Sequence, residues 1–141
     1  MGEMKRYEQF PHTSDIGIRV FGRDLKELFQ NADFAMFDTM ADLEGLKGGS
    51  EDKFSLKGKD YEDLLVLWLD ELLYNSCTKD VLYFRFEIDE LTENTIKASA
   101  FGRPAGVNRN RLKKEIKAAT YSGLHIDKTD SGYKVEIIFD V

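Results

Sequence analysis

Cysteine, proline and long apolar runs are scarce in this sequence of 141 residues, and each scarcity excludes a class of protein. Cys77 is the single cysteine, which excludes an internal disulfide and any zinc or iron–sulfur site built from several cysteines. The longest apolar run, Leu64–Leu69, has six residues, whereas a membrane-spanning helix needs about 20. Because residues 1–10 also lack the pattern of a secretion signal, we expect a cytoplasmic protein with no membrane association.

The sequence also lacks the motifs of common enzyme classes. It contains no phosphate-binding glycine loop, no nucleophile elbow and no H-E-x-x-H zinc motif. His12 and His125 are the two histidines, which leaves few candidates for a general base. His125 lies among Leu124, Ile126 and Asp127 on an expected strand, where a surface or edge position is the simplest interpretation.

The patterns that are present predict one globular α+β domain over residues 1–141. Hydrophobic residues make up 42% and charged residues 33%, and no linker or internal repeat divides the chain. Period-2 alternation predicts strands, and helical spacing after Asp24 and after Asp60 predicts two helices, each with an acidic residue three positions after its cap. We therefore expect two main helices packed on a largely antiparallel sheet, with strands at residues 16–21, 52–58, 82–86, 96–100, 116–120 and 133–141.

The second expected helix is apolar around most of its circumference, from Leu64 to Tyr74. Such a helix is either buried between layers of the fold or covered by a partner protein. The first interpretation is favoured, because a chain of this size needs one element that buries more than a single stripe.

Charge is unevenly distributed in this acidic chain, whose net charge is −6 and whose pI is about 5.0. The segment from residue 103 to residue 117 carries six basic residues and one acid, a local charge of +5. Such a segment is either a solvated surface or a docking surface for phosphates or an acidic partner. The candidates for docking are Arg103, Arg109, Arg111, Lys113 and Lys117.

Acidic groups at the two ends of the chain are the other candidate site. Asp15 follows His12 by three residues in what we expect to be a polar loop, residues 11–15, before the first strand, and Asp140 precedes Val141 and its α-carboxylate. If the first and last strands are neighbours, these three carboxylates converge, and hard oxygen donors suit calcium or magnesium better than zinc or copper. The alternatives are that Asp15 caps a turn and that the C-terminus is solvated.

Several segments resemble the archease family. Phe10–Gly17 reads F-P-H-T-S-D-I-G, which resembles the F-x-H-T-A-D-I-G opening of that family. Residues 35–38, 64–74, 115–121 and 137–141 are similar to further family blocks in the same order. The resemblance covers essentially the whole chain.

The resemblance implies a non-enzymatic activator of the RtcB-type RNA ligase, which seals RNA ends in tRNA splicing and repair. It implies that the activator promotes ligase guanylylation and multiple turnover, and that RNA is contacted indirectly, through the ligase. It also implies a divalent metal, with calcium favoured over magnesium or manganese, held by Asp15, Asp140 and Val141, with His12 as a ligand or a neighbour of the ligands. Many members have histidine where this chain has Asn110 and Ser122.

Two other functions fit the same residues. A metal-dependent phosphoester hydrolase would use the same aspartates, but the sequence offers it no evident general base beyond His12 and no second metal cluster. An RNA-binding chaperone would act through residues 103–117, but that segment lacks the aromatic residues on which bases stack.

Overall fold

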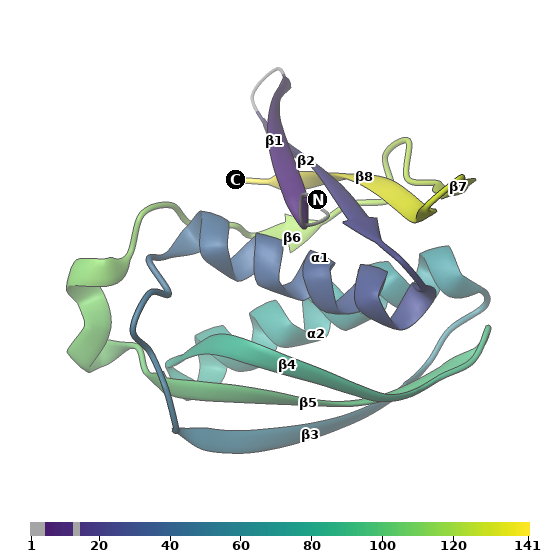
Figure 1. The fold of residues 1–141 in the computed structure, drawn as a ribbon. Coiled ribbons are helices and arrows are strands. Elements are labelled where there is room, and N and C mark those ends of the chain that lie inside the picture. The colour runs from purple at the N-terminus through teal and green to yellow at the C-terminus, as the bar shows by residue number, and fades with distance from the viewer. Residues whose placement is uncertain (1–4, 13–14) are drawn as a thin grey trace.

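Two antiparallel sheets enclose two long helices in the computed structural model, which describes residues 5–12 and 15–141 (Figure 1). The first sheet has the order β1 (Tyr7–His12), β2 (Asp15–Gly22), β8 (Gly132–Asp140) and β6 (Ala118–Ala119), and β7 (Ile126–Thr129) also pairs with β8. The second sheet has the order β3 (Ser50–Lys57), β5 (Thr95–Pro104) and β4 (Val81–Leu91). The helices are α1 (Leu25–Met40), α2 (Tyr61–Lys79) and the short 3-10 helix η1 (Gly106–Arg111).

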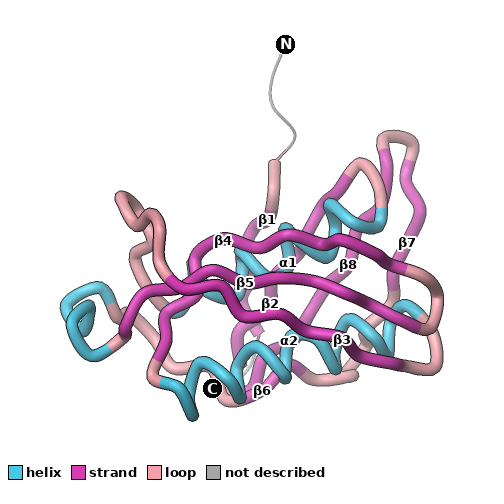
Figure 2. Tube along the Cα trace, turned by 90° about the horizontal axis from the view of Figure 1, so that it is seen from below, coloured by secondary structure: helices cyan, strands magenta, loops and turns pink. Residues whose placement is uncertain are grey.

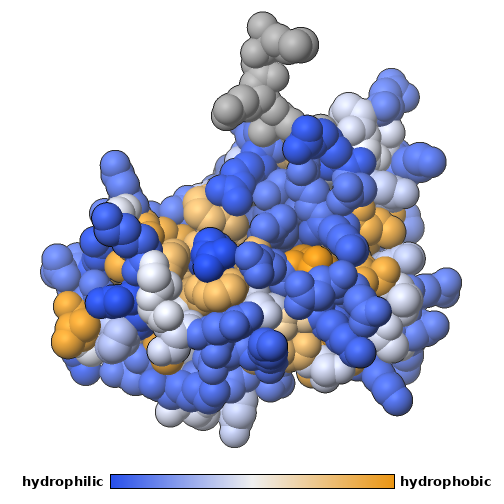
Figure 3. Space-filling model, turned by 60° about the horizontal axis from the view of Figure 1, so that its bottom comes forward, coloured by the Kyte–Doolittle hydropathy of each residue, from blue (hydrophilic) through white to orange (hydrophobic). Residues whose placement is uncertain are grey.

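The core lies between the two sheets and surrounds both long helices. Alternate residues of β2 and β8 point inward, so Ile18, Val20 and Ile137 are buried against the helices. The second sheet packs on the core with one face, and its other face, which is turned to solvent, is largely hydrophilic (Figure 3). This alternation is typical of an antiparallel sheet that packs on the core with one face only.

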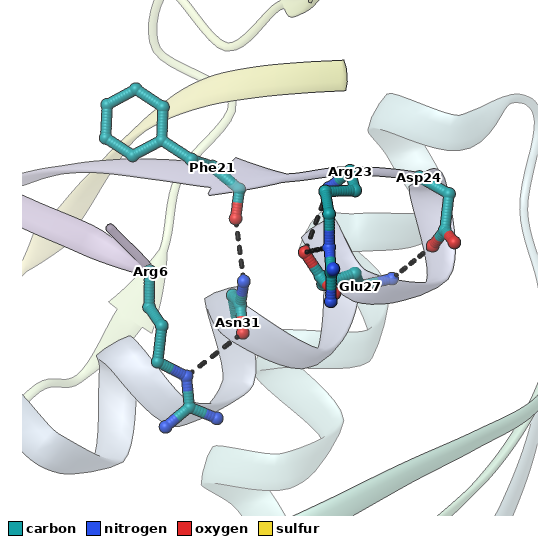
Figure 4. A network of polar contacts seen from close by, with 6 residues as sticks. All are labelled: Arg6, Phe21, Arg23, Asp24, Glu27 and Asn31. Carbon is teal, nitrogen blue, oxygen red and sulfur yellow. Dashed lines mark hydrogen bonds and ion pairs between the residues drawn. The ribbon is translucent and has the colours of Figure 1, made fainter. Parts of the chain in front are cut away.

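Both long helices begin with an aspartate cap, as predicted. The Asp24 carboxylate accepts a hydrogen bond from the backbone N–H of Glu27 at 2.8 Å, and Glu27 accepts one from the backbone N–H of Arg23 at 3.0 Å (Figure 4). Asp60 and Asp63 repeat this arrangement at the start of α2. Each pair satisfies N–H groups that have no partner within the helix, which stabilises the helix start.

Asn31 connects α1 to the two N-terminal strands. Its side-chain amide donates to the carbonyl oxygen of Phe21 at 2.7 Å, and its Oδ1 accepts from Nε of Arg6 at 3.2 Å (Figure 4). Asn31 is buried, so its amide has little access to water and depends on these two partners.

We expect Asn31→Ala to lower the free energy of unfolding by about 1 to 3 kcal/mol, because it removes the buried side chain that donates to the Phe21 carbonyl oxygen. Urea denaturation followed by circular dichroism measures the change. Asn110→Ala, at an exposed position of η1, is the matched control and should change stability by less than about 0.5 kcal/mol. Equal stabilities for the two variants would contradict this role of Asn31.

The prediction that the apolar second helix is buried between layers is confirmed. In α2, Leu64, Leu65, Trp68, Leu69 and Leu72 are completely buried. Leu67 and Tyr74 are exceptions that reach solvent, with exposed fractions of 38% and 65%.

The α+β prediction is confirmed, with differences in the strands. The strands form two sheets rather than one, and the helices lie between them. The alternation at residues 116–120 yields a two-residue strand, because the backbone joins β8 only briefly there. Pro11 and His12, expected in a loop, belong to β1, while residues 13 and 14 lie outside the described residues.

Asp33 is buried in the core, which the sequence analysis did not predict. Its side chain, on α1, is fully buried, and neither of its oxygens nor Nε1 of Trp68 on α2 has a hydrogen-bond partner among the described residues. Burial raises the pKa of the Asp33 carboxyl group well above its ordinary value, although the nearby Trp68 indole opposes the shift. The protein therefore carries a destabilising carboxyl group between its two main helices.

Among residues 5–12 and 15–141, no helix is both long and apolar enough to cross a membrane.

Candidate functional site

Asp15 and Asp140 lie side by side at one end of the first sheet. Strands β2 and β8 are antiparallel, and their register ends with Ile16 opposite Phe139, so Asp15 and Asp140 are the next pair along it. Since Ile16 and Phe139 point into the core, the two carboxylates point to the outer face. Residues opposite each other in such strands have Cβ atoms about 5 Å apart, so the predicted neighbourhood of these aspartates is present.

His12, on β1, lies next to Asp15 on the neighbouring strand. It is the register partner of Asp15, and its Nδ1 lies 3.6 Å from Oδ2 of Asp15. About two-fifths of the His12 side chain and one-third of the Asp15 side chain are exposed, so both remain accessible to a ligand. The expected convergence of these two residues is present, although they meet as cross-strand neighbours rather than within a loop.

Phe10 and Gly17 hold the two N-terminal strands in this register. They are cross-strand partners, and a Cβ atom at residue 17 would lie 2.4 Å from the Phe10 ring. A side chain there would push the ring away. The aromatic residue and the glycine in the opening motif therefore position the strands that carry His12 and Asp15.

The donor set at this edge suits a hard cation. Asp15 and Asp140 supply carboxylate oxygens, and none of the ion pairs among the described residues connects either of them to lysine or arginine. Val141 follows directly and packs its half-buried side chain against the core. Among residues 5–12 and 15–141, His, Cys, Asp and Glu side chains form no three-ligand group, so the α-carboxylate of Val141 would be needed for a third strong ligand.

The basic segment, residues 103–117, ends beside this edge. The backbone N–H of Lys117 donates to the carbonyl oxygen of Asp140 at 2.8 Å. The N–H groups of Lys113 and Lys114 donate to the carbonyl oxygen of Met40, at the end of α1. The side chains of Lys113, Lys114 and Lys117 are exposed, and we call the stretch of surface formed by residues 113–117 the lysine seam.

The arginines of the segment are dispersed. Arg111 donates from Nη1 to the carbonyl oxygens of Asp42 and Glu44, at 3.1 and 2.6 Å, so its guanidinium group stabilises a loop. Arg103 and Arg109 are exposed, on β5 and η1. Five residues were predicted to dock a partner. Of these, Lys113 and Lys117 lie together in the lysine seam, whereas Arg111 stabilises a loop.

Asp70 and Tyr121 also belong to this side of the molecule, and the sequence analysis did not single them out. The Asp70 carboxylate, on α2, accepts a hydrogen bond from the Ala119 N–H at 2.7 Å, and burial raises its pKa. The Tyr121 hydroxyl donates to Oδ1 of Asp63 at 2.7 Å, which raises the pKa of Tyr121 to about 12 and lowers that of Asp63. The sequence does contain a hint of both contacts, because Asp63 and Asp70 are acidic residues in an otherwise apolar helix.

The remaining residues singled out in the sequence lie at the surface. His125 precedes β7, its side chain is 71% exposed, and its ring nitrogens lie 2.8 Å from a carboxylate oxygen of Glu62 and 3.3 Å from one of Asp127, in agreement with the predicted surface or edge position. Asn110 and Ser122, where many archeases have histidine, are both exposed.

Comparison with known proteins identifies the family. The model of the Archease protein family (MTH1598/TM1083) matches residues 7–141. The chain belongs to the archease family. Proteins named archease from Methanosarcina mazei and Sulfurisphaera tokodaii are 37% and 31% identical to it. The alignments cover 97% of each chain for the first, and 98% of this chain and all of the relative for the second.

Solved structures share the fold of this archease. The solution structure of Methanobacterium thermoautotrophicum protein 1598 superposes with a TM-score of 0.79 at 31% identity, covering 98% of this chain and all of that one. The crystal structure of an archease from Thermotoga maritima, described as a possible chaperone, superposes with a TM-score of 0.65 at 19% identity, covering both chains completely. At that lower identity the likeness shows the fold alone. The arrangement of two sheets around two helices is thus the archease fold.

Proposed function

We propose that this archease is a non-enzymatic activator of an RtcB-type RNA ligase in the cytoplasm. It would promote guanylylation and multiple turnover of the ligase during tRNA splicing and RNA repair, and would contact RNA through the ligase. Membership in the archease family over residues 7–141 carries this proposal. The adjacent carboxylates at the end of the first sheet support it, because they provide a surface on which a cation can be presented to a partner.

The proposal includes a divalent cation at that edge. Asp15, Asp140 and the carboxylate of Val141 would hold it, with His12 as a further ligand or a hydrogen-bond partner of Asp15. We favour calcium, because three hard anionic donors with water fit its flexible coordination; magnesium and manganese are the alternatives. The cation would relieve the repulsion between the carboxylates and offer open coordination positions to a phosphate oxygen.

A ligation assay tests this function directly. The ligase is incubated with GTP and an RNA that ends in a 2′,3′-cyclic phosphate, and the number of turnovers is measured with and without this archease. We expect a single turnover or few without it and many with it. Hydrolysis of the RNA by this protein alone would instead support a metal-dependent phosphoester hydrolase, and RNA binding without an effect on the ligase would support an RNA-binding chaperone.

We expect the double charge reversal Lys113→Glu/Lys117→Glu to weaken ligase stimulation and to leave stability within about 0.5 kcal/mol of the original, because both side chains are exposed. The measurement is the concentration of this protein that gives half-maximal stimulation. The control is Lys128→Glu, an exposed position on β7. Full stimulation by the double variant at moderate salt would remove these lysines from the interface.

A further inference from the structure

Two cavities join into one groove between α2 and the segment 112–118. One has a volume of about 530 Å³ and the other about 350 Å³, and Met40, Ser76 and Glu115 border both. The C-terminal half of α2 forms one wall, and residues 112–118 form the other. At about 3.3 Å per extended residue, the second wall is at most about 20 Å long, which matches a peptide of about six residues.

Two strongly exposed apolar side chains lie in this groove. Five large hydrophobic residues of the described chain are strongly exposed, and two of them, Tyr74 and Leu112, line the groove. Leu67 lies seven residues before Tyr74, on the same side of α2, and Tyr121 contacts that helix through Asp63. In Figure 2, α2 lies along one edge of the molecule, and β3 passes across part of it. Exposed apolar side chains that line a groove typically mark an interaction site.

The segment wall of the groove is basic. The Lys113 and Lys114 side chains stand at its rim because their backbone N–H groups are fixed to the end of α1. Glu115 offsets part of this charge, and Asp70 on the opposite wall is engaged with the Ala119 N–H. In a protein with a net charge of −6, this wall attracts a ligand that carries carboxylates.

We propose that the groove receives an acidic peptide segment of the partner protein, which inserts apolar side chains between α2 and residues 112–118 and directs its carboxylates to Lys113 and Lys114. This inference rests on the proposed function and specifies how the ligase is held. The groove has an aliphatic lining that includes Met40, Leu73 and Ile116. Such a lining suits apolar peptide side chains, whereas single-stranded RNA is held mainly by stacking on several aromatic rings.

Cys77 provides a probe in the groove itself. It is exposed, lines the larger cavity and is the single cysteine of the chain, so a photoactivatable benzophenone maleimide can be attached there alone. After the labelled protein is mixed with the RtcB-type ligase and substrate RNA and irradiated, we expect crosslinks to a stretch of the ligase rich in Asp, Glu and apolar residues. Crosslinks to RNA, or to a basic stretch of the ligase, would overturn the inference.

A matched pair of variants tests the contribution of the groove to activation. Tyr74→Ser/Leu112→Ser removes exposed apolar side chains from the groove, whereas Val107→Ser removes one that does not line it and is 77% exposed. We expect the double variant to need at least tenfold more protein for half-maximal stimulation, with an unchanged melting temperature, and the control to match the original. If the original protein stimulates the ligase and the double variant does so equally well, the groove is not the docking site. Crosslinking to an acidic ligase segment without stimulation would preserve the groove and contradict the activator function.

Discussion

Asp33→Asn is expected to remove a strong decrease of stability with rising pH. In the original protein the buried carboxyl group has a raised pKa, so it stays protonated in the folded state at pH values where the unfolded chain has already ionised. The unfolded chain then binds fewer protons than the folded chain, and the free energy of unfolding falls by about 1.4 kcal/mol for each pH unit. The decrease starts near the ordinary aspartate pKa of 3.8 and ends at the raised pKa of the folded protein.

Asparagine cannot ionise, so the stability difference between variant and original should change in favour of the variant as the pH rises from about 4. Guanidinium denaturation at several pH values measures this difference, which does not depend on how well asparagine itself fits the site. Asp130→Asn, in the exposed turn between β7 and β8, is the control and should show no such trend. Parallel curves for the original protein and Asp33→Asn would show that Asp33 is not protonated in the fold.

Asp15→Ala is expected to abolish both cation binding and ligase stimulation while it changes the stability of the metal-free protein only slightly. Asp15 is the first residue of β2, and among the described residues the one Lys, Arg or His side chain within 4 Å of its carboxylate is His12, at 3.6 Å. Its removal therefore costs little packing, but it deletes one of the few anionic ligands available to a hard cation. Calorimetric titration with calcium and the ligation assay measure the two losses.

Asp140→Ala should reproduce both losses, because Asp140 is the neighbour of Asp15 across the sheet. Asp127→Ala, on β7, removes an exposed carboxylate elsewhere and should leave calcium binding intact. If Asp15→Ala instead lowers the stability of the metal-free protein by about 0.5 to 2 kcal/mol and preserves stimulation, Asp15 caps a turn and holds no metal.

The sequence predicted features that depend on local patterns. The caps Asp24 and Asp60 and the alternation in β8 follow from interactions within a few residues, and all are present. The proximity of Asp15 and Asp140 required the additional assumption that the first and last predicted strands are neighbours, and the structure confirms this for β2 and β8.

Features that depend on distant contacts were not predicted. Nothing local in the sequence assigns the strands to two sheets, because pairing is decided by the tertiary fold. Asp33 was missed although it lies four residues after Phe29 and three before Met36, on the buried side of α1. The helical spacing therefore places Asp33 among core positions. It was not predicted there because charged residues are rarely buried. The groove combines α2 with a segment more than thirty residues further along the chain, so it could be seen only in the structure.

The hydrogen bond from Ala119 to Asp70 also protects the end of the first sheet against aggregation. Strand β6 is the outermost strand on its side, and an outermost strand normally presents free N–H groups to which a strand of another molecule can attach. Asp70 occupies the N–H of Ala119, and its carboxylate would repel the carbonyl oxygens of an incoming strand. A side chain of a helix thus blocks the growth of this sheet into intermolecular β-structure.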